Sequence, residues 1–433
     1  MRRVVVTGIG VISPIGIGAG AFWDNLLSGQ VGLRRIAGFD PSGFPCQIAG
    51  EVPAFKIGDF VPKSYRKATK VMARDIELAV VAADGAFRDS GLKSHAYSET
   101  PDFDGARFGC NIGAGLISAE LTELTAAMNA ARDGNRLDMP KWGREGMSQL
   151  TPLWLLKYLP NMLACHVTII HALKGPSNTI TCADASSHLA IGEAFRTIQR
   201  GKADLAICGG AESKVQPMGL IRQTMLKRLS ETHNETPGEA VRPFDAKADG
   251  TVLGEGGGLL ILEEYERAKA RGAKMYAELV GFAATQDTYK VTEPDPSGYS
   301  YGKAISNALK EAGVAAGEVD LVVPNGLGIP AFDRAELKGL RNAFGEGLEK
   351  VAMSPIKGQI GSLAAGGGVE AAAAAMAVAH GKIPPAVNTG DIIDGVKLNV
   401  ANEAREWKVG VAVTSVFSLG GQNAALVFRA ISA

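Results

Sequence analysis

Short apolar runs alternate with longer segments of helical periodicity from one end of the chain to the other. In the longer segments apolar residues recur three or four positions apart, as at Ile76, Ala79, Val80 and Ala83, and most of these segments stop at a glycine. This pattern predicts helices over 75–90, 187–200, 303–312, 331–344 and 368–380. The short apolar runs predict strands over 4–7, 178–182, 204–208, 259–262, 320–323, 410–417 and 424–428.

The alternation of apolar strands with helices predicts an α/β fold in which helices cover both faces of a mixed sheet. The two parts of the chain look like weak repeats of each other. Each has a strand, a loop, a small-residue helix and a terminal strand ending in a glycine pair, Gly209-Gly210 in one and Gly420-Gly421 in the other. We therefore predict two halves, 1–255 and 256–433, that pack as one body.

Composition narrows the classes of function. The chain has 45 Lys+Arg and 45 Asp+Glu, so it has no basic excess to attract nucleic acid or anionic lipid. Its five cysteines are an odd number without a CxxC pair, which favours reduced thiols over disulfides or structural zinc. We see no signal-peptide profile and no apolar stretch of membrane-spanning length, so we expect a cytoplasmic protein. No pair of histidines has convincing metal-ligand spacing, and we expect neither a metal nor a cofactor.

Several specific motifs follow one another across almost the whole chain. They are VVVTGIGV at 4–11, GPS at 175–177, GKADLAICGGAE at 201–212, RPFD at 242–245, DGTVLGEGGG at 249–258, LEEYERAKARG at 262–272 and FSLGGQN at 417–423. In this ordered set the chain resembles β-ketoacyl-acyl-carrier-protein synthases of the elongating type II class. The resemblance implies a thiolase fold with two βαβαβαββ halves in a five-layered α/β arrangement. It also implies an acyl carrier protein as partner, and a homodimer or a heterodimer with an active ketosynthase.

The chemistry of that family needs a cysteine thiolate at a strand-to-helix turn, two histidines and a supporting lysine. Counting from the matched flanks puts Asp184 at the cysteine position. The same count puts Asn325 and Ser362 at the two histidine positions, while Lys357 matches the family lysine. We therefore expect the condensing chemistry to be lost.

The resemblance also implies a substrate-binding segment near the C-terminus. Its residues are Phe417, Leu419, Gly420 and Gly421. Leu419 stands where relatives carry a gating phenylalanine, which indicates an altered gate.

Each candidate residue also has a purely structural interpretation. Asp184 is either a catalytic carboxylate or, as we favour, the N-cap of the following helix. Lys357 is a candidate ion-pair partner for Asp184, and Glu370 is expected to be structural. Cys182 is expected to fill space, because no histidine remains to activate it. The Gly254–Gly258 run lacks the Lys-Ser/Thr of a phosphate-binding loop and is interpreted as a tight turn between the halves.

Three functions are compatible with these residues. The first is a non-condensing subunit that pairs with an active ketosynthase, as chain-length factors do. The second is an acyl-thioester enzyme with altered chemistry, malonyl decarboxylation or acyl transfer, that uses Asp184 and Lys357. The third is an acyl-binding structural protein.

Overall fold

The computed structural model describes residues 1–432. Pairing of β1 with β11 joins the strands of both halves into one sheet. Outward from this junction, the strands of the first half are β1 (Val4–Ser13), β10 (Glu255–Glu264), β9 (Leu205–Ser213), β5 (Phe108–Gly113) and β8 (Ser177–Ile180). Those of the second half are β11 (Ala277–Gln286), β17 (Gln422–Arg429), β16 (Val411–Phe417), β12 (Leu321–Val323) and β13 (Ala352–Met353).

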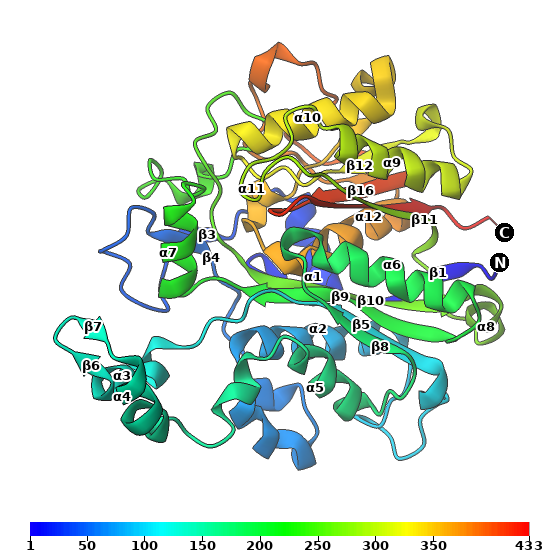
Figure 1. The fold of residues 1–433 in the computed structure, drawn as a ribbon. Coiled ribbons are helices and arrows are strands. Elements are labelled where there is room, and N and C mark those ends of the chain that lie inside the picture. Colours follow the sequence, from blue (N-terminus) through cyan, green and yellow to red (C-terminus); the bar gives the residue numbers. More distant parts are fainter. Residues whose placement is uncertain (433) are drawn as a thin grey trace.

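Helices divide the molecule into five layers, as the thiolase fold requires (Figure 1). α2 (Arg74–Ser90) and α5 (Met162–His171) cover the outer face of the first half, and α9 (Tyr299–Ala312) and α10 (Pro330–Phe344) cover that of the second. Between the first-half and second-half parts of the sheet lie α6 (Ser186–Gln199) and α12 (Gly368–His380). Smaller elements include α1 (Ala19–Leu27), α7 (Pro217–Met225), α8 (Tyr265–Ala270) and α11 (Lys357–Ile360).

The predicted helices form because their apolar faces meet these layers, and the predicted glycine stops are observed. α2 ends at Gly91 and α9 at Gly313, each with a positive φ that a glycine adopts without strain. α12 has the predicted bounds, and its run of alanines lies entirely in the core. These alanines let the helix lie close to the strands of both halves.

The glycine run at 254–258 is not the turn between halves that we predicted. Most of it lies inside β10, which pairs with β1 and β9. A Cβ on Gly258 would stand 2.3 Å from the backbone carbon of Gly368, the first residue of α12. The glycines therefore let the start of α12 rest on the sheet. Because β10 belongs to the first half, the chain changes halves after it, through α8, rather than at residue 255.

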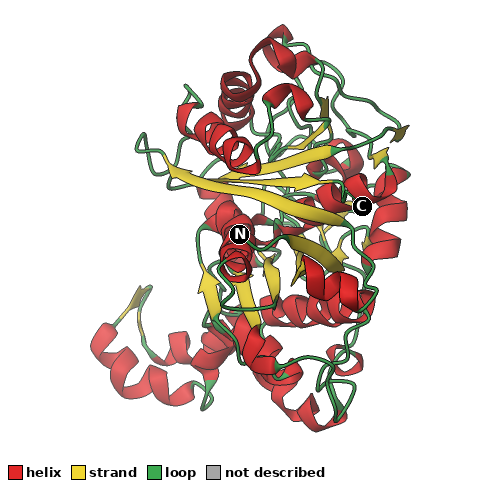
Figure 2. Ribbon diagram, turned by 90° about the vertical axis from the view of Figure 1, so that its right-hand side faces the viewer, coloured by secondary structure: helices red, strands yellow, loops and turns green. Residues whose placement is uncertain are grey.

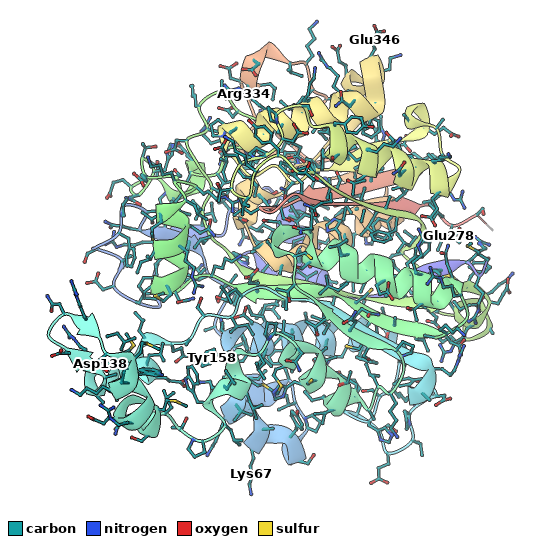
Figure 3. The ribbon with its side chains drawn as sticks, in the orientation of Figure 1. Lys67, Asp138, Tyr158, Glu278, Arg334 and Glu346 are labelled. Carbon is teal, nitrogen blue, oxygen red and sulfur yellow. The ribbon has the colours of Figure 1, made fainter. Side chains whose placement is uncertain are left out.

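One part of the structure had no counterpart in our predictions. Residues 116–158, here called the arm, project from the body and contain α3 (Leu121–Ala130), the hairpin β6 (Arg132–Asp133) and β7 (Arg136–Leu137), and α4 (Met139–Lys141) (Figure 2). Figure 3 shows Asp138 on the projecting part and Tyr158 near its return to the body. Large apolar side chains of the arm are exposed, namely Leu116, Leu121, Met128, Leu137, Met139, Met147, Leu153 and Leu155.

No helix within residues 1–432 is long and apolar enough to cross a membrane.

Candidate functional site

The turn between β8 and α6 carries Asp184. Ala183 has a φ of 48°, in the left-handed region, so the chain reverses sharply before α6 begins at Ser186. The Ser186 hydroxyl accepts a hydrogen bond from the Cys182 N–H at 2.8 Å and lies 2.7 Å from the Ala183 carbonyl oxygen. These local bonds fix the turn and bury Asp184, which is 5% exposed.

Glycines in the strands bring the start of α6 and the segment before α12 to one place. A Cβ on Gly113 of β5 would lie 2.5 Å from the Ser186 backbone carbon. A Cβ on Gly210 of β9 would lie 2.2 Å from the Ala365 carbonyl oxygen. The turn carrying Asp184 therefore meets the second half at the 362–370 segment.

Asp184 is not the helix N-cap that we predicted. It lies inside the short 3-10 turn Ala183–Ala185, and Ala185 occupies the cap position of α6 without a side-chain hydrogen bond. Within the described part of the chain, Asp184 Oδ1 is buried and has no hydrogen-bond partner. The turn therefore holds the carboxylate in place without supplying a hydrogen-bond donor to Oδ1.

The loop that begins at Asn325 is held by two buried carboxylates of α10. Glu336 accepts hydrogen bonds from the N–H groups of Asn325 at 2.7 Å and Gly326 at 2.8 Å. Asp333 accepts from the next two N–H groups, each at 3.1 Å. The Asn325 amide donates to the Phe417 carbonyl oxygen at 3.2 Å, which fixes its side chain against the end of β16.

Lys357 does not pair with Asp184, contrary to our hypothesis. Its Nζ lies 2.5 Å from Glu370 Oε1 and 3.2 Å from Asn325 Oδ1. Lys357 and Glu370 are 3% and 1% exposed, so this is a fully buried ion pair. The reason is positional: α11 starts with Lys357 and the first turn of α12 carries Glu370, both in the second half, whereas Asp184 lies in the turn before α6, in the first half.

Ser362 is held through its backbone. Its N–H donates to the Val252 carbonyl oxygen at 2.8 Å, and its own carbonyl oxygen accepts from the Gly254 N–H at 2.9 Å. The side chain is 6% exposed. A residue in this place is rigidly positioned, but its hydroxyl offers neither the base nor the cation that a histidine offers.

The four predicted substrate-binding residues lie at the end of β16 and in the turn that follows. Phe417 is buried, and Phe332 stacks on it with the ring centroids 5.7 Å apart. Leu419 is half-buried and packs against the core of the second half. Gly420 and Gly421 have φ angles of 86° and 87°, so this tight turn requires glycine.

Neither His188 nor Cys182 is poised for catalysis. His188 is fully buried, its Nε2 lies 3.0 Å from Thr414 Oγ1, and burial lowers its pKa to about 3. Cys182 is half-buried rather than enclosed, and burial raises the pKa of its thiol, which disfavours the reactive thiolate.

Sequence reasoning missed Arg228, which follows α7. It is 7% exposed, and its guanidinium carbon lies 5.0 Å from the centroid of the Phe332 ring. Burial lowers the pKa of Arg228, and the nearby charge of Asp184 partly offsets this effect. A lone arginine gives no sequence signal, because most arginines lie on the surface.

No cluster of three or more metal-ligating side chains occurs within residues 1–432. A separate pocket of about 460 Å³ lies where the arm returns to the body, with Ile117, Leu121 and Tyr158 on one side and Arg74 and Glu255 on the other. It does not include Asp184, Asn325 or Lys357.

Comparisons with known proteins agree along the whole chain. The family model for the N-terminal domain of β-ketoacyl synthases matches residues 1–268, and that for the C-terminal domain matches residues 276–390. The chain is 36% identical to the 3-oxoacyl-[acyl-carrier-protein] synthase 2 of Vibrio cholerae serotype O1, over 99% of both chains.

Solved structures of ketosynthases are also similar to this chain over its whole length. The ishigamide ketosynthase/chain length factor superposes with a TM-score of 0.86 at 28% identity, over 100% of both chains. A type II PKS acyl-carrier protein in complex with its ketosynthase bound to the hexaketide superposes with a TM-score of 0.85 at 26% identity, again over 100% of both chains.

Proposed function

The chain belongs to the β-ketoacyl synthase family, and we propose that it is a non-condensing subunit of fatty acid or polyketide-type biosynthesis that pairs with an active ketosynthase. The observation that carries the proposal is Asp184 at the strand-to-helix turn, where the family cysteine is expected. A carboxylate at a helix N-terminus is a weak nucleophile toward a thioester, and its charge opposes a developing oxyanion.

The rest of the site supports this proposal. Asn325 and Ser362 supply no imidazole, and Lys357 is already engaged by Glu370 and Asn325. His188, the histidine nearest to Asp184 in the sequence, is buried against Thr414. At the positions that we assign to the family site, these residues offer no group suited to the proton transfers of condensation.

Two surface features favour a partner subunit. β8 is an edge strand of the sheet with exposed residues, and an unpaired edge is a ready template for another strand. The arm exposes many large apolar side chains, which is typical of an interface. One of the similar structures is the ishigamide ketosynthase/chain length factor.

The test combines an acylation assay with a subunit assay. We expect the purified chain, incubated with an acyl-carrier-protein thioester and malonyl-carrier protein, to give no covalent adduct by intact-protein mass and no product. We expect the tagged chain to co-purify with a co-expressed cognate ketosynthase and to change the length of its products. An adduct on Cys182, or turnover abolished by Asp184→Ala, would instead establish an acyl-thioester enzyme.

A gain-of-function variant sharpens the first assay. Asp184→Cys places a thiol at the turn, and we expect it to acquire the acyl group without restoring condensation. Ser187→Cys, fully buried three residues further along α6, is the matched control and should stay unmodified. An unmodified Asp184→Cys variant would mean that acyl carriers do not reach this turn and would count against the proposal.

A further inference from the structure

The cavity of about 460 Å³ beside the arm is formed jointly by the arm and the body. Both ends of the arm line it, Ile117 and Leu121 on the outgoing side and Tyr158 on the return. The body lines it with the first turn of α2, the end of β9 and the start of β10. Its volume is in the range of pockets that hold small organic molecules.

The polar side of the cavity is a fixed network of hydrogen bonds. Arg74 donates to both oxygens of Glu255, from Nε to Oε2 at 3.0 Å and from Nη2 to Oε1 at 2.8 Å. Glu255 of β10 pairs with Ser213 of β9, and the Ser213 hydroxyl donates to Glu255 Oε2 at 2.9 Å. Glu255 therefore already has a cation, and its position is set by the sheet.

Asp75, the next residue of α2, lines the same cavity without a cation. It is 4% exposed, and its Oδ1 accepts a hydrogen bond from the Ser213 N–H at 3.3 Å. Within residues 1–432, no basic nitrogen lies within 4.0 Å of its carboxylate oxygens. Burial, and then the charge of Glu212, raise the pKa of Asp75 to about 8. A cation in the cavity would stabilise this carboxylate directly.

The charges that surround Asp75 favour a positive ligand over a negative one. Four lining side chains are acidic and one is basic, namely Glu51, Asp75, Glu120, Glu255 and Arg74. Arg74 is held by Glu255, and the nearby Lys214 lies 3.1 Å from Glu212. An anion would therefore be repelled by Asp75 without meeting a free cation, whereas a cation would meet a carboxylate that no side chain has paired.

The apolar walls of the cavity restrict which cation fits. They are formed by Phe39, Ile117, Leu121, Val215, Pro217 and the ring of Tyr158. The Tyr158 hydroxyl donates to Glu123 Oε2 at 2.6 Å, which holds the ring in the wall. A small hydrated cation would lose water against these walls without gaining polar contacts. An organic ammonium ion places its charge at Asp75 and its apolar body against the walls, and aromatic rings attract such a cation further.

We propose that this cavity is a binding site for a small organic ammonium ion, a primary amine with an apolar body. The ammonium pairs with Asp75, and the body packs against Ile117, Leu121 and the ring of Tyr158. The cavity is separate from the turn that carries Asp184, so this site goes beyond the proposed function and does not depend on it. Binding makes and breaks no covalent bond.

The test uses three probes that separate the charge from the apolar body: 2-phenylethylammonium, its uncharged analogue 2-phenylethanol, and methylammonium. Their dissociation constants for the full-length chain are measured by calorimetry or ligand-observed NMR at about pH 8, where the amines are cations and Asp75 begins to ionise. We expect 2-phenylethylammonium to bind at least about tenfold more tightly than either of the other two, the range of a charged hydrogen bond or a buried apolar group.

Variants assign the preference to named side chains. Asp75→Asn keeps the shape of the side chain and removes its charge, so it should reduce the preference for the ammonium over the alcohol to less than about threefold. Asp59→Asn removes an exposed acid outside the cavity and should leave the preference unchanged. Leu121→Ser, at an exposed position of the wall, should weaken both phenylethyl probes alike and keep the preference.

Each contrary outcome overturns a stated part of the proposal. Equal binding of the ammonium and the alcohol, or a preference that survives in Asp75→Asn, would exclude Asp75 as the recognition group. Methylammonium binding as tightly as 2-phenylethylammonium would exclude the role of the apolar walls, and binding of none of the probes would overturn the site. The wild-type comparison is decisive even if a variant fails to fold. No probe is an acyl thioester, so a failure here is distinct from a failure of the proposed function.

Discussion

Two pairs of opposite charges lie buried at this site, and they are organised differently. Lys357 and Glu370 approach to 2.5 Å, and Asn325 gives the lysine a second partner. Asp184 and Arg228 stay apart, and each has a buried atom without a partner among the described residues. The first pair joins two segments of the second half, α11 and α12, whereas Asp184 lies in the turn before α6 and Arg228 follows α7.

This difference bears on the stability of the fold. A buried ion pair with its hydrogen bonds made is costly to break, because either partner alone becomes an uncompensated charge. A buried charged atom without a hydrogen-bond partner has lost its hydration without a compensating bond, so it contributes nothing favourable to folding. We therefore assign Lys357–Glu370 to the architecture.

Breaking the Lys357–Glu370 ion pair should have the largest effect on the stability of the fold. Lys357→Met leaves Glu370 buried without a cation, and we expect a loss of about 3–5 kcal/mol in the free energy of unfolding measured with urea. Lys290→Met, which removes the exposed pair with Glu293, is the control and should cost less than about 1 kcal/mol. A loss below about 1 kcal/mol for Lys357→Met would show that the pair is not structural.

The close contact between α12 and β10 should be the feature next most sensitive to mutation. A methyl group on Gly258 meets the Gly368 backbone, which cannot swing away as a side chain does, so Gly258→Ala should cost about 3 kcal/mol. Gly317→Ala, where a Cβ meets nothing within 4 Å, should stay within about 0.5 kcal/mol of wild type. Thermal unfolding of the three proteins measures the difference, and equal melting temperatures would contradict it.

The buried His188 should make the stability of the fold depend on pH. Its folded pKa of about 3 is below the ordinary value of 6.5, so protons bind preferentially to the unfolded chain and stability falls as the pH drops below 6.5. Between pH 7 and pH 5 this histidine should remove about 2 kcal/mol, and His188→Gln should abolish that part of the slope. His95→Gln, at an exposed position, should not change the slope; an identical slope in His188→Gln would refute the assignment.

Removing the charges of Asp184 and Arg228 should have the smallest effect on the stability of the fold. Asp184→Asn with Arg228→Met deletes both charges where neither has a close ionic partner, and we expect a change within about 1 kcal/mol. Urea unfolding in parallel with Lys357→Met makes the contrast direct. A loss as large as that of Lys357→Met would mean that Asp184 and Arg228 belong to the scaffold.

Local signals made much of the fold predictable. α12 has the predicted bounds, and α2 and α9 end at the predicted glycines, because periodicity and a left-handed stop are properties of neighbouring residues. The arm was missed because 116–158 contains short, irregular elements without a sustained period. The Gly254–Gly258 run was assigned to a turn because nothing local shows that α12 rests on it.

The sequence alone predicted several of the strands and helices, the family resemblance, and which residues are expected at the catalytic positions. Tertiary structure alone decided what those residues touch. Lys357 forms its ion pair with Glu370 and not with Asp184. Asp184 lies inside a 3-10 turn and does not cap α6. Arg228, which the sequence analysis did not single out, packs over Phe332. The physical reason is range: helix periodicity and glycine stops act over a few residues, whereas the partner of a buried charge is set by which distant segments the layers bring together.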